Sequence, residues 1–346
     1  MTLEPIWRTD FGGPLAGAPV VVDNKIAAVS SQGDLFIVDD ANTGAVNSKA
    51  KASNIDEELI FEQVFQLSPT ELACLGPPNR PDLLYVDVAA SKIKLLRLPP
   101  PADEAASHSV QIGTDLIVPS KQGQVVRVNA QTGVVVGTPF LPPVRPGNEM
   151  NWKKPAVIGG TFFVIAADQQ VFLVDASDKT VLKQVGETTI EGTIKSHLVA
   201  TTDRAFAVVS GNQTDKLVSI AAGRTSLQPG GSADLGGLAL AGPWVVGKDV
   251  LLRMGDNSLV SFDSDLTRKW SVDLGPGILG EDPILENGSI TLVFGDGRLR
   301  QLDPGSGNIV TESNLGQPVA HRPVAAGDGV LFAGRDGTIH NAQISN

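Results

Sequence analysis

Residues 294–308 read FGDGRLRQLDPGSGN, and looser copies of this stretch recur along the whole chain. A turn at Asp296 and Gly297 lies between short apolar runs, and Asp303 then begins a second turn that ends in glycine. Glycine tolerates the positive φ of tight hairpin turns, and short apolar runs on either side are typical of strands. The stretch therefore predicts a β-hairpin followed by an exit turn.

Eight copies of this unit can be aligned, each with three strand-like runs before its exit turn. The clearest are VVVDNKIAAVSSQGDLFIVDDANTGAV at 20–46 and VQIGTDLIVPSKQGQVVRVNAQTGVV at 110–135, whereas the second and fifth copies have irregular turns. We place the residue that begins the exit turn at positions 39, 87, 129, 175, 220, 263, 303 and 341. Seven steps over these 302 residues correspond to a period of roughly 43, which is typical of a four-stranded propeller blade.

A fourth, outermost strand follows the exit turn, as in RKWSVDLG at 268–275. The opening IWRTDFG at 6–12 is similar to it, so we expect residues 5–11 to supply the outer strand of the last blade and to cover its edge. The prediction is an all-β fold: an eight-bladed β-propeller of four-stranded antiparallel blades, closed by its N-terminal strand. We expect one domain over residues 1–346.

Composition excludes several classes of function. The net charge of −11 opposes binding to a nucleic-acid backbone, and we expect no nucleic-acid partner. The single cysteine, Cys74, excludes an intramolecular disulfide and any multi-cysteine metal site, and its apolar surroundings predict a buried side chain. No run approaches the roughly 20 apolar residues of a membrane-spanning helix, so we expect no membrane insertion. The first residues lack a signal-peptide pattern, which leaves a cytoplasmic protein, a mature form or an excised domain.

The motifs QGDLFIVDDANTGAV and QGQVVRVNAQTGVV, with the tryptophan-bearing KWSVDLG, resemble the pyrroloquinoline-quinone-like (PQQ-like) repeat. The resemblance implies either a quinoprotein dehydrogenase, which holds quinone and calcium, or a cofactor-free eight-bladed propeller of the outer-membrane assembly lipoprotein type. The dehydrogenases carry neighbouring cysteines and long insertions that this chain lacks. The resemblance therefore implies a monomer that binds protein partners without a cofactor or a metal. It also implies a periplasmic or otherwise extracytoplasmic location, for a protein that is either a bacterial module by itself or part of a longer chain.

The repeated aspartates at the exit turns (Asp39, Asp175, Asp263 and Asp303) offer oxygen ligands for a metal. Calcium, however, needs 6–8 oxygens that converge on one point, and these aspartates occur once per blade. We expect each carboxylate to accept hydrogen bonds from the backbone of its own turn instead.

Polar residues occupy nearly equivalent places just before the first strand of five copies. They are His108, Lys154, His197, Asp282 and Arg322. Such positions should surround one mouth of the central channel, and concave mouths of closed β-structures favour binding sites. Either this set binds a ligand or partner, or it only keeps the channel solvated.

The longest of these loops, LPPVRPGNEMNWKK at 141–154, is the second candidate site. We predict that Arg145, Glu149, Trp152 and Lys153 contact a protein partner, because tryptophan and arginine are frequent at binding hot spots. The alternative is that Trp152 packs beneath its own loop. Trp7 and Trp270, by contrast, fall at outer-strand positions and should fill space between blades.

No catalytic motif is present, since the glycine pairs are hairpin turns and no nucleophile elbow occurs. The leading hypothesis is a non-enzymatic, protein-binding scaffold. The alternative is a quinone- or small-ligand-binding propeller, a quinoprotein-like oxidoreductase that uses the polar channel mouth. A polymer-degrading enzyme would need an acidic pair there, for which Glu281 and Asp282 are the candidates.

Overall fold

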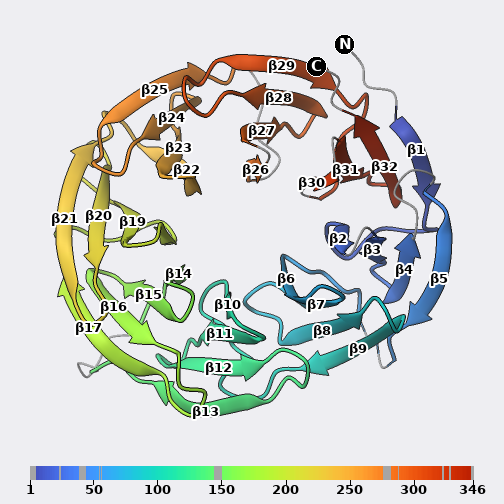
Figure 1. Ribbon diagram of the computed structural model, residues 1–346, viewed down its shortest axis with the longest axis horizontal. Helices are drawn as coiled ribbons and strands as arrows, with labels where there is room; N and C mark the ends of the chain where they lie inside the picture. Colours follow the sequence, from blue (N-terminus) through green and yellow to red (C-terminus); the bar gives the residue numbers. More distant parts are fainter. Residues whose placement is uncertain are drawn as a thin grey trace. The chain divides into compact units, whose positions relative to one another are not determined.

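The computed structural model describes residues 5–343, apart from 23–24, 39–43, 54, 56, 144–149, 276–281, 287, 322 and 327–328. Within these residues the regular structure consists of strands β1 to β32, which form eight four-stranded antiparallel sheets (Figure 1). Each sheet is one blade of the predicted eight-bladed β-propeller, so the fold prediction is confirmed. The chain divides into two compact units, which are described in turn; a single domain over 1–346 stays a prediction.

Unit 1 comprises Met1–Pro77, Asp82–Leu96 and Pro276–Asn346 and contains the first, second, seventh and eighth blades. The first two blades are β2 (Val20–Val22), β3 (Lys25–Val29), β4 (Asp34–Val38), β5 (Val46–Lys51), and β6 (Gln63–Ser68), β7 (Glu71–Leu75), β8 (Asp82–Asp87), β9 (Lys92–Arg97). The seventh is β26 (Ile284–Glu286), β27 (Ser289–Val293), β28 (Arg298–Leu302), β29 (Ile309–Asn314). The eighth is β30 (Val324–Ala326), β31 (Gly329–Ala333), β32 (Thr338–Gln343), with β1 (Pro5–Asp10) outermost.

Unit 2 comprises Pro78–Pro81 and Arg97–Gly275 and contains the third to sixth blades. The third and fourth are β10 (Val110–Ile112), β11 (Asp115–Pro119), β12 (Val125–Asn129), β13 (Val135–Phe140), and β14 (Ala156–Ile158), β15 (Phe162–Ala167), β16 (Gln170–Asp175), β17 (Lys183–Thr189). The fifth and sixth are β18 (Val199–Ala200), β19 (Arg204–Val209), β20 (Lys216–Ala222), β21 (Leu227–Asp234), and β22 (Ala239–Val246), β23 (Asp249–Met254), β24 (Ser258–Phe262), β25 (Arg268–Asp273).

The N-terminal strand closes the last blade as predicted. In Figure 1 the dark blue β1 runs beside the red β32, and the two pair antiparallel, with Arg8 opposite His340. The Arg8 guanidinium lies 3.0 Å from the Asp336 carboxylate, which adds an exposed ion pair to the strand pairing. The two ends of the chain therefore meet in one sheet.

Tryptophans of the outer strands fill space as predicted, since Trp7 is 7% and Trp270 9% exposed. Trp7 packs against the exit turn of the first blade, where Gly44 has a φ of +67°. A Cβ atom on Gly44 would collide with the Trp7 ring, so glycine is required there both for the backbone conformation and for the close approach.

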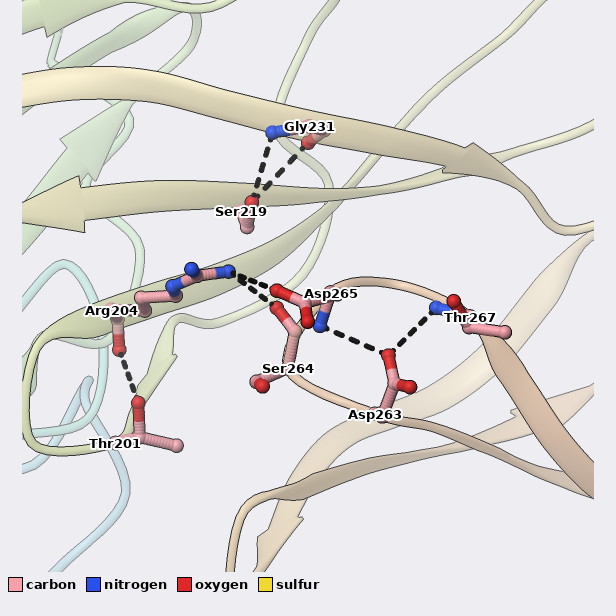
Figure 2. A network of polar contacts seen from close by, with 8 residues as sticks. All are labelled: Thr201, Arg204, Ser219, Gly231, Asp263, Ser264, Asp265 and Thr267. Atoms are coloured by element: carbon pink, nitrogen blue, oxygen red, sulfur yellow. Dashed lines mark hydrogen bonds and ion pairs between the residues drawn. The ribbon is translucent and has the colours of Figure 1, made fainter.

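The exit-turn aspartates act within their own turns, which confirms the local interpretation where the structure describes them. The Asp263 carboxylate accepts hydrogen bonds from the backbone amides of Asp265 and Thr267, each at 2.9 Å (Figure 2). Asp175 and Asp303 accept amide hydrogen bonds in the same way, both at 2.8 Å. Asp39 lies outside the described residues.

Two exit-turn positions were predicted in the wrong register. In the third blade Asp115 pairs with Asn129, and the equivalent pairs are Arg204 with Ala221 in the fifth and Gly329 with Gln343 in the eighth. The residues equivalent to Asn129 are therefore Ala221, one residue after Ile220, and Gln343, two residues after Asn341. The irregular turn before β20 and the short final copy obscured the register, but a shift this small leaves the repeat period unchanged.

Apolar cores lie between neighbouring blades of each unit. In unit 1, Leu35 and Ile37 of the first blade pack with Leu72 and Cys74 of the second. Cys74 is buried as predicted, and this burial raises the pKa of its thiol to about 12. In unit 2, Val164 and Leu173 of the fourth blade pack with Ala205 and Val218 of the fifth, along with other residues. Burial of the inward-facing residues of adjacent sheets supplies the main stabilisation.

Two arginines of unit 2 join blades through exit turns. Arg204 on β19 donates to the Ser264 carbonyl at 2.7 Å and to the Asp265 carboxylate at 3.2 Å (Figure 2). Arg127 on β12, 2% exposed, donates to the carbonyls of Ala176 and Asp178 in the fourth blade. Ala176 and Ser264 each follow an exit-turn aspartate, so the two arginines donate hydrogen bonds to equivalent backbone carbonyls.

Candidate partner-binding face

The joining loops, which lead from the outer strand of one blade to the inner strand of the next, share one structural position. In six of the joining loops, one residue pairs with the end of the second strand that follows it. The observed pairs are Leu15 with Ser30, Ala105 with Ser120, Trp152 with Ala167, Ile194 with Val209, Ala239 with Met254, and Val319 with Gly334. These pairings bring the joining loops beside the turns between second and third strands, and in unit 2 we call this side the loop face.

Trp152 occupies this shared position and is 1% exposed. Its ring lies 6.2 Å from Phe140 and 6.0 Å from Phe172, within the core between the third and fourth blades. The structure therefore supports the packing alternative for Trp152. The sequence carried a signal for this, because an apolar residue or alanine precedes the inner strand at similar spacing in five copies.

Three further predicted contact residues belong to loop 141–154. Arg145 and Glu149 lie outside the described residues. Lys153 is half-buried, and its backbone amide donates to the Ala166 carbonyl at 2.8 Å, directly after the Trp152 pairing. A partner-binding role for the loop stays a prediction.

The predicted channel-mouth residues of unit 2 do occupy equivalent places. His108, Lys154 and His197 each lie two residues before β10, β14 and β18, and all three are half-buried. The inner strands β10 and β14 contact each other, as do β14 and β18, and the Leu198 amide donates to the Lys154 carbonyl at 3.2 Å. In unit 1, Asp282 is exposed two residues before β26, and Arg322 lies outside the described residues.

Histidines of the joining loops bond to the next blade. The His197 ring nitrogen Nε2 lies 2.8 Å from the Pro243 carbonyl, which belongs to the sixth blade. In unit 1, His321 Nε2 lies 3.0 Å from the Leu15 carbonyl, and burial lowers the pKa of His321 while this hydrogen bond partly opposes the shift. Both contacts link blades, which gives these side chains a structural role; ligand binding at the channel mouth stays a prediction.

A cavity of about 310 Å³ opens on the loop face beside loop 141–154. Its apolar side is formed by Pro143, Met150 and Ala167, and Met150 approaches the turn of the third blade at Gly123. Its polar side is formed by the turn between the second and third strands of the fourth blade, by the adjoining ends of β16 and β17, and by the joining loop that follows. These residues are Asp168, Gln169, Gln170, Thr189 and Thr193. Sequence reasoning missed this cavity, because its polar side comes from a different part of the chain than loop 141–154.

Backbone hydrogen bonds hold the polar side of the cavity. The amide of Ile194 donates to the Asp168 carbonyl at 2.8 Å, and the amide of Ile190 donates to the Gln169 carbonyl at 2.9 Å. Asp168 has a φ of +53°, so its carboxylate is displayed from a tight turn. The turn and the joining loop thus form a pre-formed wall rather than two independent loops.

Exposed leucines extend the loop face onto the sixth blade. Leu238 is 53% and Leu240 61% exposed, on either side of the buried Ala239. The Asp215 carboxylate, 2% exposed, accepts a hydrogen bond from the Ala239 amide at 2.8 Å and lies 2.5 Å from the Lys195 ammonium. This buried carboxylate anchors the segment that displays the two leucines.

Among the described residues, no group of three or more histidine, cysteine, aspartate or glutamate side chains is arranged to hold a metal ion. No helix in the described part of the chain is long and apolar enough to span a membrane.

The fold and its repeat define the class of protein: an eight-bladed PQQ-like propeller. The family model described as outer membrane protein assembly factor BamB matches residues 3–214 and 183–345, and the chain belongs to this family. A search of curated protein sequences found no match.

Solved structures share the fold at low sequence identity. BamB from Moraxella catarrhalis has a TM-score of 0.65 and 14% identity, with 100% of this chain and 99% of that chain covered. The computationally designed Ika8 protein has a TM-score of 0.66 and 10% identity, with 99% and 100% covered. Sqt1 from Saccharomyces cerevisiae has a TM-score of 0.65 and 11% identity, with both chains covered completely.

Proposed function

We propose that this protein is a non-enzymatic scaffold that binds a protein partner through the loop face of unit 2. The observation that carries the proposal is the cavity beside loop 141–154, in the joining loop predicted to contact a partner. Exposed Leu238 and Leu240 lie on the same face, in the sixth blade, and exposed apolar side chains favour protein contacts.

The repeat itself supports a binding role rather than catalysis. The described exit-turn aspartates are engaged in their own turns, and His197 is bonded to the neighbouring blade. What differs between blades is the joining loops, and loops on a rigid scaffold commonly carry recognition. The family description refers to outer-membrane protein assembly, which supports an extracytoplasmic location. We further propose that the scaffold is monomeric and forms a single domain.

A pull-down with matched variants tests the proposal. The immobilised protein is exposed to an envelope extract of the source organism, and captured proteins are identified by mass spectrometry. The double variant Leu238→Ser/Leu240→Ser should lose the partner, because it removes the apolar surface proposed to contact it. Both side chains are exposed, so the change should leave the core intact. Ile309→Ser/Val310→Ser on β29, which also changes two exposed apolar residues, should retain it.

Loop 141–154 is tested in the same way with Arg145→Ala/Glu149→Ala, since replacing the buried Trp152 would also disrupt the core. Capture of the same proteins, in the same amounts, by the parent protein, the leucine double variant and the loop double variant would contradict the proposal.

A further inference from the structure

The cavity on the loop face has two chemically different sides, and together they specify a kind of ligand. Pro143, Met150 and Ala167 present hydrocarbon and a thioether, whereas the facing wall presents two glutamine amides, two threonine hydroxyls and one carboxylate. At about 310 Å³ the space lies at the lower end of the range for small-molecule pockets. It therefore suits one or two side chains of a larger ligand better than a complete cofactor.

The polar groups of the wall are available to a ligand. The side chains of Gln169, Gln170, Thr189 and Thr193 make no hydrogen bond to other described residues, and all four are exposed. Amide and hydroxyl groups both donate and accept, so they match the alternating N–H and C=O groups of an extended peptide backbone. These four uncharged side chains favour a polypeptide over a multiply charged ligand.

The carboxylate of Asp168 favours a ligand with a positive charge. Among the described lining residues, Asp168 alone has a charged side chain, and its carboxylate is exposed without an ion-pair partner among those residues. The chain as a whole carries a net charge of −11, which adds a long-range preference for a cationic ligand. A lysine or arginine next to the inserted apolar side chain would satisfy this carboxylate.

We propose that the cavity binds an extended peptide segment of the partner, in which a large apolar side chain contacts Met150 and Pro143 and an adjacent lysine or arginine pairs with Asp168. This inference rests on the proposed scaffold function and specifies the chemistry of its partner. The wall is pre-formed, because backbone hydrogen bonds from Ile190 and Ile194 fix the turn that bears Asp168. Binding to such a site costs less ordering of the protein than binding to a mobile loop.

Selection from a phage library of random heptapeptides on the whole protein tests the proposal. The selected peptides should share a large apolar residue next to lysine or arginine, and a synthetic peptide of that sequence should bind in a fluorescence-anisotropy titration. Thr193→Trp, which fills the cavity from an exposed position, should abolish binding. Glu104→Trp is the matched control, since Glu104 is exposed and precedes Ala105 as Thr193 precedes Ile194, and it should bind normally.

Asp168→Asn separates charge from shape, because asparagine also tolerates a positive φ. It should weaken the peptide by about 3- to 5-fold, and the difference should shrink in high salt, as for an exposed ion pair. Selected peptides without a basic residue, or equal binding to Thr193→Trp, would overturn the inference. If those results appeared while Leu238→Ser/Leu240→Ser still lost its captured partner, the scaffold function would stand and only the peptide chemistry would fail.

Discussion

The exit turns and the joining loops belong to the same blades, yet they use their polar residues in opposite ways. At the described exit turns, carboxylates such as Asp263 and Asp303 bind amides two to four residues away, and this repeats from blade to blade. The joining loops share a paired residue, such as Trp152 or Ile194, but differ in length and in most of the side chains around it. Repetition therefore marks the scaffold, and the differences mark the candidate recognition site.

Removal of residues 1–10 should have the largest effect, because it deletes β1 and the buried Trp7 and leaves β32 without its outer neighbour. We expect the melting temperature to fall by about 10 °C or more, since loss of a buried tryptophan alone costs about 3–5 kcal/mol. Differential scanning calorimetry measures the change. Removal of residues 1–4 alone is the control, and an equal melting temperature for both truncations would disprove the closure.

Trp152→Ala tests whether the shared position of a joining loop belongs to the core. The truncation leaves a cavity beside Phe140 and Phe172, so the free energy of unfolding should fall by about 3–5 kcal/mol. Trp152→Phe should lose clearly less, because part of the aromatic packing remains. Urea denaturation measures the free energy of unfolding of both variants. An alanine variant as stable as the parent protein would contradict the core role of Trp152 and would favour the predicted partner contact instead.

Asp303→Ala tests the exit turn and should cost less, about 0.5–1.5 kcal/mol, because the lost hydrogen bonds to Ser306 are exposed. Asp303→Asn should be nearly neutral. Asparagine already serves this place in the third blade, where the Asn129 side chain accepts a hydrogen bond from the Thr132 amide at 3.0 Å. Comparable loss in both variants would mean that the charge, and not the turn geometry, matters.

His321 should give a small dependence of stability on pH. Burial lowers its pKa below the ordinary 6.5, so the unfolded chain takes up the proton first as the pH falls below that value. The contribution of His321 to stability is therefore complete above pH 6.5 and is lost as the pH falls through the lower folded-state pKa. In His321→Asn the decrease in melting temperature between pH 7.5 and 5.0 should be smaller than in the parent protein; an identical decrease would contradict this.

Addition of pyrroloquinoline quinone with calcium should have the smallest effect, because we expect no saturable shift in the melting temperature of the protein. This result would separate the scaffold from the quinoprotein alternative at the channel mouth. A saturable shift that disappears in Lys154→Ala would instead support ligand binding there.

Much of the fold could be predicted because the repeat depends on interactions between residues that are close together along the chain. Turn glycines, exit-turn aspartates and alternating apolar residues act over a few neighbours, so eight copies sufficed to predict the blades and the N-terminal outer strand. The register failed at Ile220 and Asn341, where irregular or terminal copies lack the turn residues that mark it. The candidate site was predicted less well, because Trp152 was assigned from its residue type rather than from its place in the repeat.

The sequence by itself determined the number of blades, their four strands and the role of the exit turns, because each depends on residues close together along the chain. Only the tertiary structure decided that Trp152 is a core residue, that His197 bonds to the next blade, and that Met150 faces the wall formed by Asp168 and Thr193. These contacts join segments from different blades. Their geometry follows from how neighbouring sheets pack, which no single repeat encodes.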